Sequence, residues 1–368
     1  MYHSLPTPPE DPALNTRPNA SLSVIIVNYN GGDFIQAAVD HLARQTCPAD
    51  EVIIIDNASC DGSADRLDLS ALPKSRLIRQ DINLGFAAAN NLAARQAAGD
   101  WLVLLNPDTE PQPDWLEKLL HATARHPEAS MFASAQIDAV DHRTLDGAGD
   151  CYFILGIPWR GGFGLRADEL PNEGECFSPC GASALFRKSA FLDAGGFEES
   201  FFCYCEDVDL GFRLRLKGEH CIFVPDAVVR HHGSAISGRY SDFTIRLGTG
   251  NRLRTYLANM PPLALAFTLP GHVLATLYLY LRALGKPQAR SMRRGIGEAL
   301  KTLPDVLRRR RAIQRARKLS SLQIACAMSW NPADLHGRRP HVWKQKAGGL
   351  QPSPPDLLAA VQPSEDRQ

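Results

Sequence analysis

Short apolar runs alternate with amphipathic segments through the first third of the chain. Each run is continuous, rich in Val, Ile or Leu and bounded by polar or turn-forming residues, which predicts a strand buried on both faces. The predicted strands cover 23–28, 51–55, 75–80 and 101–106, and helical spacing predicts helices at 33–45, 86–98 and 113–127. This alternation indicates an α/β fold, with a mostly parallel central sheet flanked by helices.

Polar side chains follow each predicted strand at its carboxyl end. Any one of them is explained as a helix cap or a turn residue. In an open α/β sheet, however, ligands bind outside the carboxyl ends of the strands, so four such loops together predict one shared site. The residues are Asn28, Asp56, Asn57, Asn83, Asn106 and Asp108.

Composition narrows the class of protein. The chain has 368 residues, of which 44% are hydrophobic and 22% charged, as in a packed globular protein. Its formal net charge is zero, and no glycine-rich dinucleotide fingerprint or lysine-containing phosphate loop occurs, so a dehydrogenase or NTPase is not indicated. Nine cysteines without a regular framework, and a polar, proline-rich start at 1–20, suggest reduced thiols in the cytoplasm.

Carboxylates gather again in the second half of the chain, after a glycine- and aromatic-rich stretch at 131–180 that we expect to be a loop-rich, substrate-facing insertion. Glu206, Asp207 and Asp209 follow an aromatic segment and open a predicted helix. Helix capping alone does not require three acids in four residues, and desolvation by aromatic rings raises a carboxyl pKa toward that of a general base. Cys203-x-Cys205 suggests zinc only weakly, because no second pair accompanies it.

These motifs resemble those of the family 2 glycosyltransferases, and within them the rhamnosyltransferase-like branch. The similar segments stand in family order, cover about 21–260, and read SVIIVNYNGGDFIQAAVDHLARQ, EVIIIDNASCDGS, NLGFAAANN, WLVLLNPDTEP, CGASALFRKSAFLDAGGFEESFFCYCEDVDLGFRLRLKG and VVRHHGSA. The resemblance implies a GT-A nucleotide-diphospho-sugar transferase fold and transfer of a sugar, with inversion, to an acceptor hydroxyl.

The resemblance also assigns roles to residues. It places Asp56 and Asn57 on the nucleoside, Val27 and Asn28 beside the base, and the loop of Asn83, Gly85 and Phe86 over the nucleotide. Asn106-Pro107-Asp108 matches the metal motif, with Asn where the two-carboxylate form has Asp, which leaves Asp108 as the main carboxylate. Mg²⁺ or Mn²⁺ there would neutralise the diphosphate leaving group.

Three further residues complete the implied site. Asp207 matches the family's general base, and Glu206 either hydrogen-bonds the acceptor or orients the base. His231 matches a histidine that can complete the metal shell, although an ordinary loop histidine is the equal alternative.

The last third of the chain changes character. Residues 260–281 contain no Asp, Glu, Lys or Arg, and this segment is long enough to cross a bilayer. Pro270-Gly271, however, interrupts the segment in its middle. Residues 282–318 then carry thirteen Lys or Arg against two acids. Nucleotide sugars are cytoplasmic, so the catalytic part before 260 must be cytoplasmic, and a basic segment such as 282–318 is also expected on the cytoplasmic side. A single crossing by 260–281 would place the two on opposite sides of the membrane. We therefore expect an interfacial or re-entrant helical pair, with the basic segment on anionic headgroups; a helix buried against the catalytic domain is the alternative.

Together these features predict a leader at 1–20, a GT-A catalytic domain at 21–258, a membrane-associating helical segment at 259–320 and a mostly irregular tail at 321–368. We expect an inverting glycosyltransferase, peripheral or monotopic on the cytoplasmic face of the membrane, that takes a sugar, rhamnose by resemblance, to a lipid-linked or polysaccharide acceptor in cell-surface glycan biosynthesis. Nucleic acid is not an expected partner, because no aromatic residues interleave the arginine run. A nucleotidyltransferase of related fold and a non-catalytic nucleotide-sugar-binding protein are the alternatives.

Overall fold

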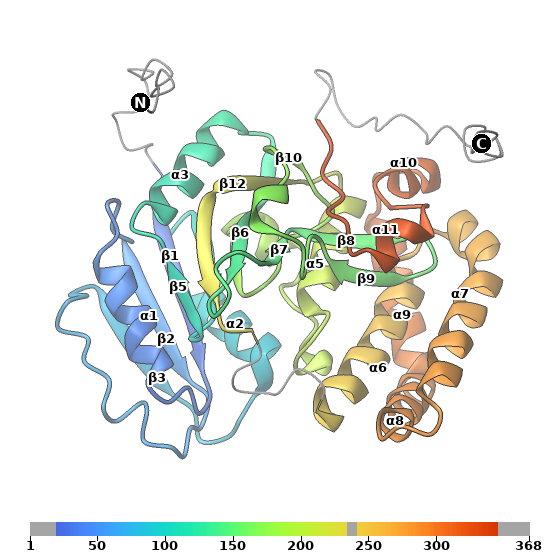
Figure 1. Ribbon diagram of the computed structural model, residues 1–368, viewed down its shortest axis with the longest axis horizontal. Helices are drawn as coiled ribbons and strands as arrows, with labels where there is room; N and C mark the ends of the chain where they lie inside the picture. The colour runs from blue at the N-terminus through green and yellow to red at the C-terminus, as the bar shows by residue number, and fades with distance from the viewer. Residues whose placement is uncertain (1–19, 234–240, 345–368) are drawn as a thin grey trace, which may run out of the picture.

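A ten-stranded sheet forms the centre of the computed structural model, which describes residues 20–233 and 241–344 (Figure 1). Its order is β10-β12-β6-β11-β4-β1-β2-β3, with β5 paired to β12 and β7 to β6. Two further strands, β8 (Asp150–Phe153) and β9 (Ile157–Arg160), form a separate hairpin. The strands of the large sheet are β1 (Leu22–Asn28), β2 (Glu51–Asp56), β3 (Ser75–Arg79), β4 (Trp101–Leu105), β5 (Thr109–Pro111), β6 (Ala129–Asp138), β7 (Leu145–Ala148), β10 (Gly174–Glu175), β11 (Ser183–Arg187) and β12 (His220–His231).

The four predicted strands are β1 to β4, and they form the parallel part of the sheet. Their ends differ from the prediction by only a residue. Beyond β4 the sheet is mixed, because β11 runs antiparallel to both β4 and β6, whereas β12 runs parallel to β6. The α/β fold class with helices around the sheet is therefore confirmed.

Helices cover both faces of this sheet, which explains the continuous apolar strands. On one face, α1 (Phe34–Ala43) and α3 (Trp115–Arg125) pack against alternate side chains of β1, β2 and β4. On the other face lie α2 (Gly85–Gln96), α4 (Lys188–Asp193) and α5 (Glu206–Leu216). A strand packed on both sides has no polar face to present to water.

The expectation for 131–180 was wrong in its first part. β6 is not part of an insertion, because it is a buried central strand between β11 and β12. The rest of the stretch is loop-rich as expected, with β7 to β10 and the short 3₁₀ helix η2 (Ala167–Glu169). A second 3₁₀ helix, η3 (Glu199–Phe201), precedes α5, which begins at Glu206 and so includes Asp207 in its first turn.

Helices make up most of the chain after 241 and lie together on the right of Figure 1. Among them α6 packs on α5, α8 and α9, and it ends one residue beyond the predicted domain limit at 258. The helices are α6 (Asp242–Asn259), α7 (Pro262–Ala283), α8 (Gln288–Lys301), α9 (Leu303–Ala316), α10 (Ser321–Cys326) and α11 (Pro332–His336).

The predicted helical pair at 260–281 is instead one continuous helix, α7, with Pro270 inside it. The next residue, Gly271, serves close packing, because a Cβ there would lie 2.8 Å from a methyl carbon of Leu155. One residue further, His272 Nδ1 is 2.7 Å from the Leu155 carbonyl oxygen. The Pro-Gly pair therefore marks an approach to the hairpin loop and not a break in the helix.

The described part of the tail is more ordered than expected. Around α10 and α11 the chain returns to the strands, where Ser329 bridges to Phe153 of β8 and Trp343 bridges to Glu175 of β10. These backbone bridges anchor residues up to 344. The predicted leader and the end of the predicted tail lie outside the described residues.

Candidate active site

A cleft of about 910 Å³ lies at the carboxyl ends of β1, β2 and β4. The loops after these strands meet there with the segment before α5 and the hairpin of β8 and β9. The predicted residues that line it are Val27, Asn57, Asn83, Gly85, Phe86, Asn106, Asp108, Glu206, Asp207 and His231. The parallel topology thus brings together loops that are far apart in the sequence.

Amide side chains build the side of the cleft formed by the loops after β2 and β3. Asn57 Nδ2 donates to Asn83 Oδ1 at 2.8 Å, and Asn57 Oδ1 accepts from the backbone N–H of Leu84 at 2.9 Å. Asn83 Oδ1 also accepts from the N–H of Gly85 at 2.8 Å. The buried Asn57 side chain therefore fixes the loop that leads into α2.

Asn28 and Asp56 do not line the cleft. Both side chains are buried, and Asn28 Nδ2 donates to Asp56 Oδ1 at 3.1 Å. The same nitrogen lies 3.1 Å from the Ser59 hydroxyl and 3.0 Å from the Ser63 hydroxyl. The structure thus gives this pair a place in the network that joins the loops after β1 and β2, and contact of the pair with a nucleoside stays a prediction.

Strand pairing places His231 beside Asp108. β5 directly follows Asp108, and its Thr109 pairs with His231 of β12. His231 Nε2 lies 3.4 Å from Asp108 Oδ1 and makes no hydrogen bond to the described residues. A buried ring nitrogen beside a carboxylate is a suitable pair of ligands for a divalent ion.

Asp146 and Arg160 support this histidine from behind. Asp146 Oδ2 lies 2.6 Å from His231 Nδ1 and also accepts from Arg160 Nη1. Burial lowers the pKa of His231, but the carboxylates of Asp108 and Asp146 outweigh it and leave the pKa above its ordinary value. The bond to Nδ1 orients the ring so that Nε2 faces Asp108, as in many carboxylate–histidine–metal sites.

Asp207 also lines the cleft. Its Oδ2 accepts from the N–H of Gly181 and its Oδ1 from the N–H of Val208, both at 2.8 Å. These bonds fix the carboxylate at the start of α5 and leave each oxygen further lone pairs. A half-buried carboxylate held in this way can accept a proton from a hydroxyl group in the cleft.

Two more carboxyls flank Asp207. Burial and the nearby charge of Asp207 hold the pKa of Glu206 well above its usual range, and Glu206 Oε2 has no hydrogen-bond partner among the described residues. Asp150 has a raised pKa for the same two reasons, although the charge of Arg160 opposes the shift. The β8–β9 register places Asp150 opposite Arg160. Both carboxyls are thereby favoured in the neutral form.

The sequence analysis did not identify Asp146, Asp150 or Arg160. They lie in the glycine-rich stretch between β6 and η2, which no recognised motif marks. The one feature of the sequence that could have identified these three residues is their charge within a segment that is otherwise mostly apolar. Among the described residues that line the cleft, Arg160 is the single Arg or Lys, against four carboxyls.

No group of three or more His, Cys, Asp or Glu side chains is arranged to hold a metal ion within 20–233 and 241–344. Cys203 and Cys205 line the cleft with thiols whose pKa burial raises, which does not favour a zinc thiolate site. An ion on Asp108 and His231 would therefore need further ligands from a bound molecule.

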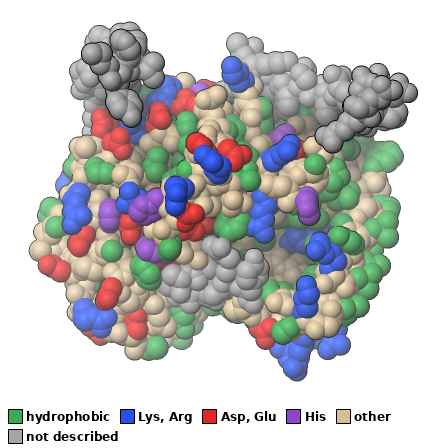
Figure 2. Space-filling model, viewed as in Figure 1, with side chains coloured by type: hydrophobic (Ala, Val, Ile, Leu, Met, Phe, Trp, Pro, Cys, Tyr) green, Lys and Arg blue, Asp and Glu red, His purple; other side chains and the backbone are tan. Residues whose placement is uncertain are grey.

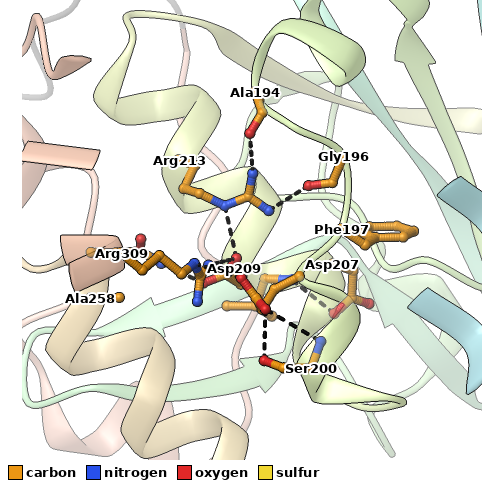
Figure 3. A network of polar contacts seen from close by, with 12 residues as sticks. Ala194, Gly196, Phe197, Ser200, Asp207, Asp209, Arg213, Ala258 and Arg309 are labelled. Atoms are coloured by element: carbon orange, nitrogen blue, oxygen red, sulfur yellow. Dashed lines mark hydrogen bonds and ion pairs between the residues drawn. The ribbon is translucent and has the colours of Figure 1, made fainter. Parts of the chain in front are cut away.

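Asp209, the third acid of the 206–209 cluster, forms ion pairs that hold helices together. Figure 3 shows the Arg213 and Arg309 guanidiniums converging on its carboxylate, and Asn259 Nδ2 donates to it at 2.8 Å. Burial raises the pKa of Asp209, but the two guanidiniums outweigh it and leave the pKa below its ordinary value. This network ties α5 to α6 and α9.

The arginine run is only partly available to a membrane. Arg309 binds Asp209 and Glu198, and Arg310 donates to the carbonyl oxygens of Leu257 and Met260. The expectation that the whole basic segment lies on lipid was therefore wrong at these two residues, because their guanidiniums satisfy buried groups of the protein. Arg308 and Arg311 remain exposed.

α7 exposes a nearly continuous apolar surface along the right edge of Figure 2. Among the described residues it is the one helix long and apolar enough to cross a membrane, and only 11% of its most apolar window is buried. The alternative of a helix buried against the catalytic domain is therefore wrong. Basic side chains gather below it over α8 (Figure 2). The exposed apolar residues of α7 include Leu263, Phe267, Leu269, Val273, Leu274, Leu277, Tyr278 and Leu281.

Comparison with known proteins assigns the family. The model of glycosyl transferase family 2 matches residues 23–194. An N-acetylglucosaminyl-diphospho-decaprenol L-rhamnosyltransferase of Mycobacterium tuberculosis is 32% identical over 243 residues, which cover 59% of this chain and 78% of that protein. The chain belongs to glycosyl transferase family 2. As a member of this family it is a glycosyltransferase of glycan biosynthesis, and the expected enzyme class is confirmed.

Other similar proteins agree with this assignment. The O-antigen biosynthesis protein RfbC of Myxococcus xanthus is 29% identical over 240 residues, which cover 60% of this chain and 18% of that protein. The crystal structure of GalNAc-T7 with UDP, GalNAc and Mn²⁺ has a TM-score of 0.53 at 18% identity, over 65% of this chain and 48% of that chain. The fold of this family 2 enzyme is accordingly the GT-A fold.

Proposed function

We propose that the chain transfers a sugar, with L-rhamnose the first to test, from a nucleoside diphosphate to a lipid-linked acceptor, with inversion at the sugar. One observation carries the proposal: a single cleft holds both the Asp108–His231 pair and the Asp207 carboxylate. Transfer with inversion needs a site for the diphosphate and one base on the opposite face of the sugar.

The charge of the cleft supports a divalent cation as cofactor. Arg160 is the single Arg or Lys among the described residues that line the cleft, so the protein offers little positive charge to balance the two phosphates of a diphosphate. Asp108 and His231 would hold Mg²⁺ or Mn²⁺, which supplies neutralisation of the leaving group. The place of His231 Nε2 beside Asp108 Oδ1 fits this assignment, and the diphosphate oxygens would complete the ligand shell.

The base in this proposal is Asp207. The acceptor hydroxyl forms a new bond to the anomeric carbon while the bond from that carbon to the diphosphate oxygen breaks and its electron pair leaves with the diphosphate. The hydroxyl proton passes to Asp207. Glu206 and Asp150, both favoured as neutral carboxyls, can donate hydrogen bonds to the acceptor without adding negative charge beside Asp207.

Donor and acceptor are assigned from the relative. The similar mycobacterial protein is named for L-rhamnosyl transfer to N-acetylglucosaminyl-diphospho-decaprenol. The exposed apolar face of α7 and the basic side chains over α8 are suited to a membrane that carries such an acceptor. We therefore propose a monotopic enzyme on the cytoplasmic face of the membrane.

Transfer is tested by incubating the purified protein with dTDP-rhamnose, UDP-sugars or GDP-sugars, with Mn²⁺ or Mg²⁺, and a synthetic lipid-diphosphate sugar acceptor. We expect a lipid product one sugar heavier by mass spectrometry, and none with Asp207→Asn. Binding of donor without transfer would favour a nucleotide-sugar-binding protein instead. Release of inorganic diphosphate from a nucleoside triphosphate would favour a nucleotidyltransferase, although a single cleft arginine argues against triphosphate binding.

Membrane association is tested by flotation with vesicles of phosphatidylcholine and phosphatidylglycerol. Phe267 of α7 and Val140, far from α7 in the sequence, are both 84% exposed, so Phe267→Glu and Val140→Glu form a matched pair. We expect binding to weaken roughly 10- to 100-fold for the first substitution alone, because an inserted aromatic ring contributes about 1.5–3 kcal/mol. Equal binding of both variants would contradict a membrane-facing α7.

A further inference from the structure

The backbone between η3 and α5 follows an unusual path. Phe202, Tyr204 and Cys205 are not glycines, yet all three have positive φ, at 63°, 72° and 66°. The N–H of Cys203 donates to the carbonyl oxygen of Phe201 at 2.7 Å, which closes a γ-turn at Phe202. Conformations of this kind persist only where the surrounding structure imposes them. Glu206 and Asp207 follow immediately.

A single amide side chain holds this path. Asn251 of α6 is fully buried, and its Nδ2 lies 3.0, 3.0 and 2.9 Å from the carbonyl oxygens of Phe201, Cys203 and Tyr204. An amide has two hydrogens, so the three oxygens share them. Without this side chain, three carbonyl groups in the interior of the turn would lose their common donor.

Arg254, one helical turn further along α6, fixes the orientation of that amide. Its Nη1 donates to Asn251 Oδ1 at 2.8 Å, and its Nε donates to the Thr302 hydroxyl at 3.0 Å. Because Asn251 Oδ1 faces a donor, its nitrogen must face the carbonyl oxygens of the turn.

The same turn also touches the nucleotide side of the cleft. The carbonyl oxygen of Phe202 accepts from the N–H of Ala87 in α2 at 3.1 Å. Its ring lies so close to Gly85 that a Cβ there would be 2.6 Å from the ring. A change in the turn would therefore alter the distance between the donor side and the carboxylates of α5.

We propose that Asn251 is a positioning residue for sugar transfer: its amide holds the strained turn at 201–205 and thereby places Asp207 in the cleft. This inference rests on the proposed function. It also assigns part of the active-site geometry to α6, which lies outside the segment that the family model matches.

The test compares Asn251→Ala and Asn251→Asp with the wild-type enzyme. Aspartate keeps the shape and the acceptor for Arg254 but, when ionised, donates no hydrogen bond to the turn. Both variants are expected to lose about a hundredfold in kcat, as for a small misplacement of a catalytic group. The donor KM should change by less than about threefold, because donor contacts are made by other residues.

Gln45→Ala is the matched control. The Gln45 side chain is buried and also bonds three backbone groups, the carbonyl oxygens of His41 and Gln112 and the N–H of Leu116. Those contacts join α1 to α3, away from the cleft. We expect a lower melting temperature and an unchanged kcat, which separates loss of stability from loss of positioning.

Hydrogen exchange gives a readout that does not depend on activity. The amides of 201–207 should exchange faster in Asn251→Ala than in the wild type, and at the wild-type rate in Gln45→Ala. Unchanged exchange, or wild-type kcat in both Asn251 variants, would overturn the positioning role. A wild-type enzyme that transfers no sugar would overturn the proposed function instead, and exchange would still decide whether Asn251 holds the turn.

Discussion

The two sides of the cleft are built by different means. On the side where we propose that the nucleotide binds, neutral amides such as Asn57 and Asn83 bond one another and the backbone where parallel strands end. On the side where we propose proton transfer, backbone N–H groups and a strained turn hold Asp207, and the supporting groups come from the β8–β9 hairpin and α6. Neutral amides hold a shape at small electrostatic cost, whereas burial and the charge of Asp207 raise the pKa of the neighbouring carboxyls Glu206 and Asp150.

The sharpest way to break this comparison is Asp207→Asn. The amide keeps an oxygen for the N–H of Gly181 or Val208, so the fold should persist, but it has no basic oxygen for the acceptor proton. We expect kcat to fall about a thousandfold. Steady-state transfer with labelled donor measures this, and Glu199→Gln serves as an exposed control. Activity within tenfold of wild type would remove Asp207 as the base.

Arg160→Ala should have the next largest effect. It removes the single Arg or Lys among the described residues of the cleft lining, and with it one of the ion pairs of Asp146. We expect kcat/KM to fall about a hundredfold, as for loss of one electrostatic stabiliser. Arg160→Lys should recover only part, because an ammonium keeps the charge and not the planar geometry. Equal activity of the alanine and lysine variants would show that this charge is not used.

Asp146→Asn tests the metal side through a residue that does not face the ion directly. Because Asp146 orients His231 through Nδ1, we expect the half-activating Mn²⁺ concentration to rise about thirtyfold. Activity after removal of metal with a chelator should return on adding Mn²⁺ in both proteins, at different concentrations. The same activation curve for variant and wild type would contradict the assignment of His231.

Asn57→Ala should weaken the nucleotide side alone. The variant loses the bonds that hold Asn83 and Leu84, which predicts about tenfold higher donor KM with little change in kcat. Titration of the donor at saturating acceptor separates the two parameters. A larger fall in kcat than rise in KM would mean that the two sides are not independent.

The smallest effects concern stability against pH. Glu206 keeps its proton when folded at pH values where the unfolded group, with a pKa near 4.5, has lost it. The folded state then binds more protons, so stability falls as pH rises above about 4.5. Glu206→Gln cannot lose a proton, so it escapes this loss of stability. The melting temperature of the variant minus that of the wild type should therefore increase by roughly 4 °C between pH 5 and pH 8.

Glu175 provides the opposite sign. Burial raises its pKa, but Arg215 and His220 outweigh it and lower the pKa to about 2. Its stabilising contribution is present above about 4.5 and is lost as pH falls toward 2. Glu175→Gln should therefore lower the melting temperature at pH 7. Parallel pH curves for the Glu206 and Glu175 variants would contradict both assignments.

Prediction from the sequence succeeded where a pattern is local. The strands β1 to β4 and their helices were found within one or two residues, because burial on both faces leaves a continuous apolar run. It failed at Pro270, where a Pro-Gly pair usually ends a helix. There, the contact of Gly271 with Leu155 replaces the expected break.

The candidate site divides in the same way. Asp108 and Asp207 were found because they stand in recognisable motifs at the ends of a strand and the start of a helix. Arg309 was expected on lipid, because the sequence of a basic run does not show which of its arginines are buried. Only its ion pair with Asp209 in the folded chain distinguishes them.

The sequence by itself determined the parallel half of the sheet, the crevice at its carboxyl edge and the family. The tertiary structure decided that His231 stands beside Asp108, that Asp146 and Arg160 support it, and that Asn251 spans the turn before Asp207. Hydrophobic period reports only which face of an element is buried. The partner of a buried polar group lies tens of residues away, and only strand pairing and helix packing bring the two together.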